Sequence, residues 1–103
     1  MINPAQVRFE RLIQEKRDEI IAIADKHGAY NLRIFGSIAR GEATEKSDID
    51  LLIDRDLTRT SPWFPAGLKL DLEDLLGVSV DVGTVNSLKT RIRERVLSEA
   101  KPL

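Results

Sequence analysis

Two acidic residues inside an apolar stretch are the side chains of this chain best suited to chemistry. Asp48 and Asp50 are two positions apart and alternate with Ile49, Leu51 and Ile53. On a strand, both carboxylates point to the same face, about 6.7 Å apart at the backbone for a rise of roughly 3.3 Å per residue. Like charges this close repel each other, so the pair is best tolerated beside a cation. Magnesium fits, because it binds one or two carboxylates and completes its shell with water and phosphate oxygens.

The same pair has a plainer interpretation as the solvated face of an edge strand, because Asp-x-Asp often occurs by chance. Two Asp residues within a strand of Ile and Leu contradict local propensity, however, and such conflicts are expected at functional sites. Carboxylates with this spacing can bridge two metal ions roughly 3.5 to 4 Å apart. On Asp48 and Asp50 alone, both interpretations stay open.

A turn suited to phosphate binding precedes the acidic pair. Gly36 and Ser37 follow a short extended run, and Gly lets the backbone approach a phosphate closely. A helical turn after Gly36 would direct free N–H groups at an anion, and Ser37 adds a hydroxyl donor. Arg40, one turn further on, could reach a phosphate oxygen with its guanidinium group. A plain strand-to-helix turn would also use a Gly-Ser pair.

The elements that must position these residues follow from the apolar periodicity. Asn3 and Pro4 are typical of a helix start, and helical spacing continues to Gly28. Strands are predicted over residues 31–35, 47–54 and 78–84, and further helices over residues 68–76 and 88–100. With a helical turn after Gly36, helices and strands alternate along the chain. The expected fold class is therefore α/β, with two layers around a small sheet.

The run from Phe35 to Asp54, FGSIARGEATEKSDIDLLID, resembles the minimal nucleotidyltransferase (MNT) family of the DNA-polymerase-β-like nucleotidyltransferase superfamily. Gly-Ser and Asp-x-Asp are shared across the superfamily, whereas the segment 39–43, Ala-Arg-Gly-Glu-Ala, is more particular to MNT and aminoglycoside-type enzymes. A leucine-rich helix ending at Gly77 and the strand around Asp81 extend the resemblance over nearly the whole chain. It implies a polymerase-β-like palm fold, with a small mixed sheet of about three strands flanked by about four helices.

The resemblance also implies a complete site. In the superfamily, an acid on the next strand completes the metal site and can accept the proton of the attacking hydroxyl, and Asp81 holds that position here. The implied catalytic and metal-binding residues are Asp48, Asp50 and Asp81, which would hold two Mg²⁺ ions, and the implied nucleotide-binding residues are Gly36, Ser37 and Arg40. The nucleotide substrate is expected to be ATP. We expect the site to assemble fully only when nucleotide is bound.

The activity that the resemblance implies is transfer of AMP from ATP to a hydroxyl of a partner protein. MNT proteins are small bacterial and archaeal proteins often paired with a HEPN-domain partner in toxin–antitoxin modules. The chain would be the antitoxin, and the acceptor would be a tyrosine of the HEPN toxin. Two alternatives stay open: a catalytically idle antitoxin that neutralises the toxin by binding, and a nucleotidyltransferase that acts on a small molecule such as an aminoglycoside.

Length and charge narrow the classes of protein. The 103 residues are expected to form a single domain, residues 1–103, whose size leaves no room for an acceptor-binding domain. A net charge of −1 with interspersed signs disfavours direct nucleic-acid binding. The sequence has no cysteine, no apolar run of membrane-spanning length and no leader pattern. We expect a cytoplasmic protein that does not bind membranes.

Three further features lie outside the predicted site. His27 is interpreted as a helix-end residue favoured by the helix dipole. Trp63 and Phe64 are either core residues or a patch that faces a partner. The C-terminal helix alternates Lys and Arg with Glu94 and Glu99, which predicts a solvated, ion-paired face.

Overall fold

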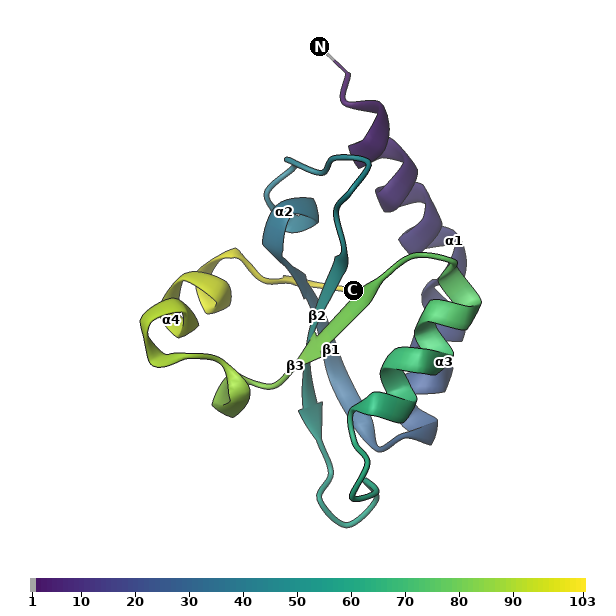
Figure 1. Ribbon diagram of the computed structural model, residues 1–103, viewed down its shortest axis with the longest axis vertical. Helices are drawn as coiled ribbons and strands as arrows, with labels where there is room; N and C mark the ends of the chain where they lie inside the picture. Colours follow the sequence, from purple (N-terminus) through teal and green to yellow (C-terminus); the bar gives the residue numbers. More distant parts are fainter. Residues whose placement is uncertain (1) are drawn as a thin grey trace.

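A mixed four-stranded sheet is the centre of the computed structural model, which describes residues 2–103 (Figure 1). Its strands are β1 (Ala29–Phe35), β2 (Ile49–Arg55), β3 (Val80–Gly83) and β4 (Lys101–Pro102), in the spatial order β3-β2-β1-β4. β1 is antiparallel to both β2 and β4, whereas β2 and β3 are parallel. The small mixed sheet is therefore confirmed, with β4 in addition. β4 has two residues, too few to carry a period-two signal.

Within the same residues, four α-helices flank this sheet. α1 (Pro4–Lys26) and α3 (Ala66–Leu76) lie side by side on one side of it, and α4 (Thr90–Glu99) lies on the other (Figure 1). The short α2 (Gly36–Ala39) follows β1 directly, and a 3-10 turn, η1 (Val85–Ser87), follows β3. The predicted α/β class with about four helices is confirmed.

Helix α1 begins where the sequence predicts. The side chain of Asn3 accepts a hydrogen bond from the Gln6 N–H at 3.1 Å, and Pro4 occupies the first turn, where no N–H partner is needed. Phe9 and Ile20 are buried on the face that contacts the sheet and α3. Among the helices of residues 2–103, none combines the length and apolar character that crossing a membrane requires.

Except at one position and at its C-terminal end, buried and less buried residues alternate along β2. Ile49, Leu51 and Ile53 are buried, as predicted for the core-facing side. Leu52, on the same side as the acids, is also fully buried. The acidic face of β2 is therefore interrupted by an apolar residue, and Asp50 stands alone near the N-terminal end of the strand.

Helix α3 is the crossover that makes β2 and β3 parallel. Leu68, Leu72 and Leu76 are its buried residues, spaced to form one apolar stripe. The helix ends at Gly77, whose φ of +69° is the left-handed conformation expected of a glycine C-cap. A crossover of this length lets β3 pair in register beside β2.

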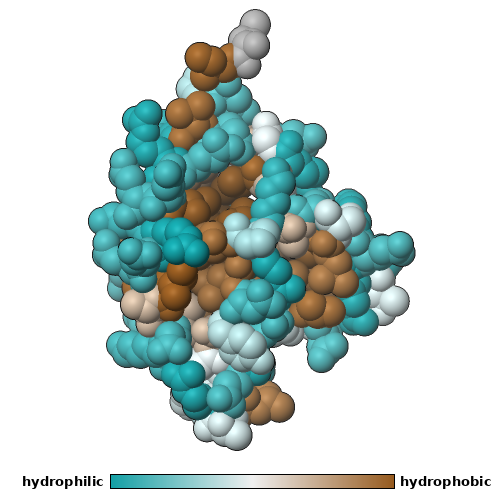
Figure 2. Space-filling model, turned by 180° about the vertical axis from the view of Figure 1, so that it is seen from behind, coloured by the Kyte–Doolittle hydropathy of each residue, from teal (hydrophilic) through white to brown (hydrophobic). Residues whose placement is uncertain are grey.

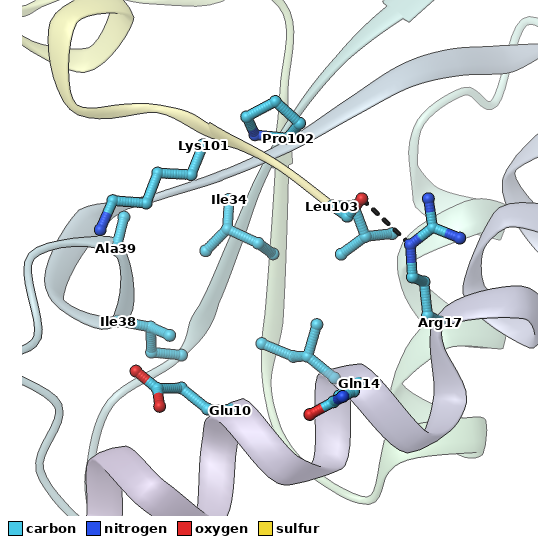
Figure 3. A pocket seen from close by; sticks show the side chains of 10 residues that line it. Glu10, Gln14, Arg17, Ile34, Ile38, Ala39, Lys101, Pro102 and Leu103 are labelled. Carbon is cyan, nitrogen blue, oxygen red and sulfur yellow. Dashed lines mark hydrogen bonds between the residues drawn. The ribbon is translucent and has the colours of Figure 1, made fainter.

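An apolar hollow of about 270 Å³ lies between α1 and β4. Ile13, Ile34, Ile38 and Leu103 contribute to its lining (Figure 3). Figure 2 shows apolar side chains gathered in the middle of the rear face of the molecule. Arg17 Nε donates to the backbone oxygen of Leu103 at 3.1 Å at the edge of the hollow. The residues that the sequence singles out for chemistry do not line it.

The remaining expectations for single residues are resolved by their contacts. Phe64 packs against the core and lies 4.7 Å from the guanidinium of Arg55, whereas Trp63 is 79% exposed and lies outside the core. His27 Nε2 is 2.7 Å from Asp71 Oδ2, so this residue joins the end of α1 to α3. That contact agrees with the structural interpretation of His27.

Candidate active site

The parallel pairing of β2 and β3 places two of the three expected acids side by side. Asp50 is the register partner of Asp81, and the neighbouring pair is Ile49 with Val80. Asp48 is exposed and precedes the first residue of β2 by one position, while Asp50 is half-buried and Asp81 is exposed. The strand pairing therefore groups acids that are 31 residues apart in the sequence (81 minus 50) at one end of the sheet.

Burial and neighbouring negative charge both act against the ionised form of Asp50. Burial, and after it the negative charges of Asp81 and Asp48, together raise the pKa of Asp50 from 3.8 to about 6. The positive charge of Arg40 acts in the opposite direction and is the weaker effect. A carboxylate held this way is stabilised by a nearby cation, because the cation offsets both the repulsion and the lost hydration.

Mg²⁺ prefers oxygen ligands such as carboxylates, so the side chains of Asp48, Asp50 and Asp81 are of the type that this ion binds. Among residues 2–103, no three acidic or histidine side chains share one coordination sphere as they stand. Asp81 instead has Lys69 beside it, with Lys69 Nζ 3.8 Å from Asp81 Oδ1. Repulsion between the carboxylates keeps the acids apart when no cation is bound. The contact of Asp81 with Lys69 has the same effect. That the site assembles fully only when nucleotide is bound remains a prediction.

The backbone conformation at Gly36 and its closeness to Asp50 leave no room for a side chain at position 36. Its φ of +77° is a conformation that residues with a side chain rarely adopt. A Cβ at this position would also overlap Asp50 Oδ2. The absence of a side chain therefore lets the turn between β1 and α2 lie directly against the Asp50 carboxylate.

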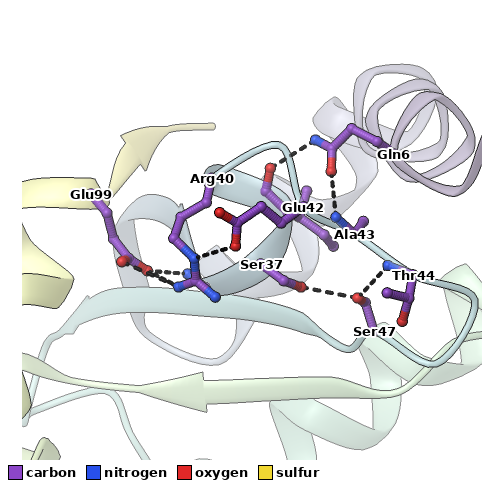
Figure 4. A network of polar contacts seen from close by, with 10 residues as sticks. Gln6, Ser37, Arg40, Glu42, Ala43, Thr44, Ser47 and Glu99 are labelled. Carbon is purple, nitrogen blue, oxygen red and sulfur yellow. Dashed lines mark hydrogen bonds and ion pairs between the residues drawn. The ribbon is translucent and has the colours of Figure 1, made fainter. Parts of the chain in front are cut away.

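The side chain of Glu99, the last residue of α4, reaches the same turn. Its Oε2 accepts a hydrogen bond from the Gly36 N–H at 2.6 Å, and Arg40 Nη1 lies 3.1 Å and 3.3 Å from its two carboxylate oxygens (Figure 4). Arg40 Nε also donates to Glu42 at 3.2 Å. The pKa of Arg40 is raised by these contacts with Glu42 and Glu99. The Gly36 amide and the Arg40 guanidinium thus already bind one carboxylate together.

This contact corrects the expectation for Glu99. The alternating charges of the C-terminal helix predicted a solvated, ion-paired face, but the Glu99 side chain is only 12% exposed. Its partners Gly36 and Arg40 are about 60 residues earlier in the chain. A pattern read within one helix contains no information about such a contact.

The predicted hydroxyl donor, Ser37, is engaged with a neighbour. Its Oγ lies 3.0 Å from Ser47 Oγ, and Ser47 Oγ in turn accepts from the Thr44 N–H at 2.9 Å (Figure 4). Ser37 lies in α2 next to Gly36, so it is close to the group described above. The Ser37–Ser47 contact joins the turn to the segment that leads into Asp48.

Gln6 is a buried polar residue that the sequence reasoning missed. Its side chain donates to the Ile38 backbone oxygen at 2.8 Å and accepts from the Ala43 N–H at 3.0 Å (Figure 4). Asn3 donates to the backbone oxygen of Ala43 at 2.9 Å. Both backbone groups of Ala43 are therefore bound by the start of α1, which holds the segment that carries Arg40. A single Gln among the apolar positions of a helix gives no signal of this role.

The chain is similar over most of its length to known nucleotidyltransferases. The model of the nucleotidyltransferase domain family matches residues 17–103. A relative from Methanocaldococcus jannaschii, named as a candidate protein adenylyltransferase, is 42% identical over 95 residues, covering 85% of this chain and 94% of the relative. The protein adenylyltransferase MntA of Thermococcus cleftensis is 39% identical over 77 residues, covering 75% of this chain and 77% of the relative.

Solved structures agree with these sequence matches. A structure described as a candidate minimal nucleotidyltransferase superposes with a TM-score of 0.78 at 44% identity, covering 90% of this chain and 94% of that one. A chain of a toxin–antitoxin structure with AMP-PNP superposes with a TM-score of 0.64 at 22% identity, covering 82% and 69%. At that identity, the second likeness concerns the fold alone.

Proposed function

The chain belongs to the nucleotidyltransferase domain family, as a minimal nucleotidyltransferase, and from this we propose that it adenylylates a hydroxyl of a partner protein. Nucleotidyl transfer is the activity of the family, and the acceptor is the proposed part. Two relatives at 42% and 39% identity carry protein adenylyltransferase in their names, which supports a protein acceptor. The nucleotide is ATP in this proposal.

One observation carries the assignment of the site: Asp50 pairs in register with Asp81 and lies against Gly36. In the proposed reaction, the acceptor oxygen attacks the α-phosphorus of ATP. The bond from that phosphorus to the oxygen bridging to the β-phosphorus breaks, and pyrophosphate leaves. The proton of the acceptor hydroxyl passes to the Asp81 carboxylate, which is exposed and therefore open to an acceptor from another molecule.

The acids and the turn take different parts in this proposal. Asp48, Asp50 and Asp81 would hold Mg²⁺, which supplies charge neutralisation to the phosphates when it is bound. Gly36, Ser37 and Arg40 would bind the β- and γ-phosphates. The support for a phosphate site is that the Gly36 N–H and the Arg40 guanidinium converge on one anionic group, the Glu99 carboxylate. Positioning and electrostatics would supply the catalysis.

The acceptor in this proposal is a tyrosine of a HEPN-domain toxin, and the chain acts as its antitoxin in the cytoplasm. The toxin partner rests on the resemblance to the MNT family, whose members are often paired with a HEPN-domain partner in toxin–antitoxin modules. The toxin–antitoxin structure with AMP-PNP has the same fold and so supports only the architecture. Adenylylation would silence the toxin by attaching a bulky anionic group.

The test is transfer of label from ATP that carries it at the α or at the γ phosphorus, with Mg²⁺ and a co-purified or genome-neighbour partner protein. The expected result is covalent attachment of the α label alone to the partner, with tyrosine as the modified residue in its mass spectrum. Asp48→Asn and Asp50→Asn should abolish transfer. Asp54→Asn is the matched control, because Asp54 is on the same strand but is paired with Arg33 at 2.8 Å.

Three outcomes separate the candidate functions. Loss of both transfer and toxin neutralisation in the Asn variants supports the enzyme. Neutralisation that persists in Asp48→Asn without any transfer supports an antitoxin that acts by binding. Transfer of the α label to an added aminoglycoside but not to the partner protein supports a small-molecule acceptor.

A further inference from the structure

The donors proposed to bind nucleotide phosphates are occupied by a side chain of the protein itself. Glu99 Oε2 accepts from the Gly36 N–H at 2.6 Å, and both oxygens of the same carboxylate lie within 3.3 Å of Arg40 Nη1. A carboxylate presents two anionic oxygens, as one edge of a phosphate group does. Glu99 therefore satisfies the same donors, with the same sign of charge, that a phosphate would use.

The position of Glu99 is electrostatically unfavourable apart from these contacts. Its negative charge adds to those of Asp81 and Asp48, which already act against ionisation of Asp50. The carboxylate is also largely removed from water, with 12% of the side chain exposed. A carboxylate stays in such a place only because charge-assisted hydrogen bonds hold it there. The Gly36 N–H and the Arg40 guanidinium therefore form a binding site for an anionic group.

Little structure has to change for Glu99 to leave. Within α4, Val96 is the one buried residue, so few apolar contacts hold the helix itself, while β4, two residues after Glu99, is paired with β1. Glu99 is the last residue of that helix, and its side chain reaches the turn from the helix end. Rotation of the Glu99 side chain, or a shift of α4, would free the Gly36 N–H and the Arg40 guanidinium.

We propose that Glu99 is an internal competitor for the phosphate site, and that nucleotide binds by displacing its carboxylate from Gly36 and Arg40. The inference rests on the proposed function for the identity of the ligand. Glu99 holds the turn in a binding-competent shape and lowers the apparent affinity for nucleotide, because each binding event must first break its contacts. Glu99 is thus a gating residue and not a catalytic one.

The test is the affinity for α,β-methylene-ATP with Mg²⁺, measured by titration calorimetry. The carbon bridge of this analogue prevents release of pyrophosphate, so the measurement reports binding without transfer. Glu99→Ala is expected to bind the analogue about tenfold more tightly than the parent, a gain of about 1.4 kcal/mol, since the charge-assisted hydrogen bonds of the Glu99 carboxylate no longer compete. Glu99→Gln keeps the shape of the side chain without its charge, so its affinity for the analogue should lie between those of the parent and Glu99→Ala.

The matched control is Glu94→Gln, on the same helix. Glu94 is exposed, and the substitution makes the same change in net charge. At physiological salt the Debye length is about 8 Å, so removal of an exposed charge that does not contact the turn should leave the affinity unchanged. A gain in both Glu99→Gln and Glu94→Gln would assign the effect to net charge and overturn the proposal.

A second readout follows the Gly36 amide directly by NMR. In the parent without nucleotide, its proton should resonate far downfield because of the short bond to a carboxylate, and Glu99→Ala should remove that shift. Addition of inorganic triphosphate should restore it in Glu99→Ala. A Gly36 amide that is the same in parent and variant would show that the contact is not formed in solution, which overturns the proposal.

The outcomes distinguish this inference from the proposed function. If the parent binds the analogue and Glu99→Ala binds it equally or more weakly, the competitor role is wrong while adenylyl transfer stands. If neither protein binds the analogue or inorganic triphosphate, both proposals are wrong.

Discussion

The carboxylate of Asp50 lies directly against the Cα of Gly36, in space that a Cβ at position 36 would fill. Gly36 is also held at a φ of +77°. Two independent constraints, one of backbone conformation and one of space, therefore exclude a side chain here. The contact joins the turn after β1 to the acidic end of β2, so that a shift of either would move the other.

Gly36→Ala is expected to abolish nucleotide binding and to lower the free energy of unfolding. The left-handed backbone alone should cost about 1 kcal/mol, and displacement of the Asp50 carboxylate adds to it. The control is Gly77→Ala, because Gly77 has a φ of +69° with no atom near its missing Cβ. Urea unfolding and affinity for the Mg²⁺–nucleotide analogue are the two measurements. Equal affinities in the two variants would show that the Gly36–Asp50 contact does not shape the site.

Asp50→Asn is expected to stabilise the fold when no divalent cation is present. Folding raises the pKa of Asp50 from 3.8 to about 6, mainly through burial. The ionised carboxylate therefore destabilises the folded state above about pH 6, and this cost is lost as the pH falls toward 4. Because Asp50 is only half-buried, Asp50→Asn should raise the free energy of unfolding by on the order of 1 kcal/mol at pH 7.5 and by less at pH 5.

The check on Asp50→Asn is thermal unfolding in a chelator at both pH values. Asp54→Asn is the comparison, since it removes a partner of Arg33 and should not stabilise the protein. Added Mg²⁺ should reduce the advantage of Asp50→Asn if the carboxylate is a metal ligand. If Asp50→Asn stabilised the protein equally at pH 5 and pH 7.5, the raised pKa would not belong to Asp50.

The parts of the fold that the sequence predicts are those with local causes. Asn3 and Pro4 mark the start of α1 because capping depends on the next few residues, and Gly77 ends α3 for the same reason. The expectation that Asp81 joins Asp50 in one site came from a family resemblance. Its physical cause, the parallel register of β2 and β3, is not encoded in either strand alone.

The parts that the sequence did not predict depend on contacts between distant segments. Glu99 meets Gly36 only because α4 ends beside the turn, and Gln6 meets Ala43 only because α1 crosses the segment after α2. Leu52 breaks the alternation of β2 because the acidic side of the strand is partly covered. Each is a property of tertiary packing, which a period of 2 or 3.6 along the chain cannot express.

Lys69→Gln is expected to lower the Mg²⁺ concentration needed for half-maximal transfer. Lys69 Nζ lies 3.8 Å from Asp81 Oδ1, so the ammonium competes with a cation for that carboxylate. Exposed pairs contribute up to about 1 kcal/mol, so the decrease should be at most about fivefold. Lys16→Gln is the control, since Lys16 pairs with Glu19 at 3.7 Å on α1. An unchanged Mg²⁺ dependence with a higher KM for ATP would instead indicate that Lys69 contacts the nucleotide.

Gln6→Ala is expected to weaken both the fold and nucleotide binding. Gln6 is 7% exposed, and its loss leaves the Ala43 N–H without its partner and the Ile38 carbonyl with the Gly41 N–H alone. The cost should be about 2 kcal/mol, roughly a 10 °C decrease in Tm for a chain of this size. Gln14→Ala makes the same change at an exposed position of α1 and should shift Tm by little. Because Gln6 holds the segment that carries Arg40, affinity for the nucleotide analogue should fall several-fold even at temperatures where the variant is fully folded. Loss of stability with unchanged affinity would confine Gln6 to a structural role.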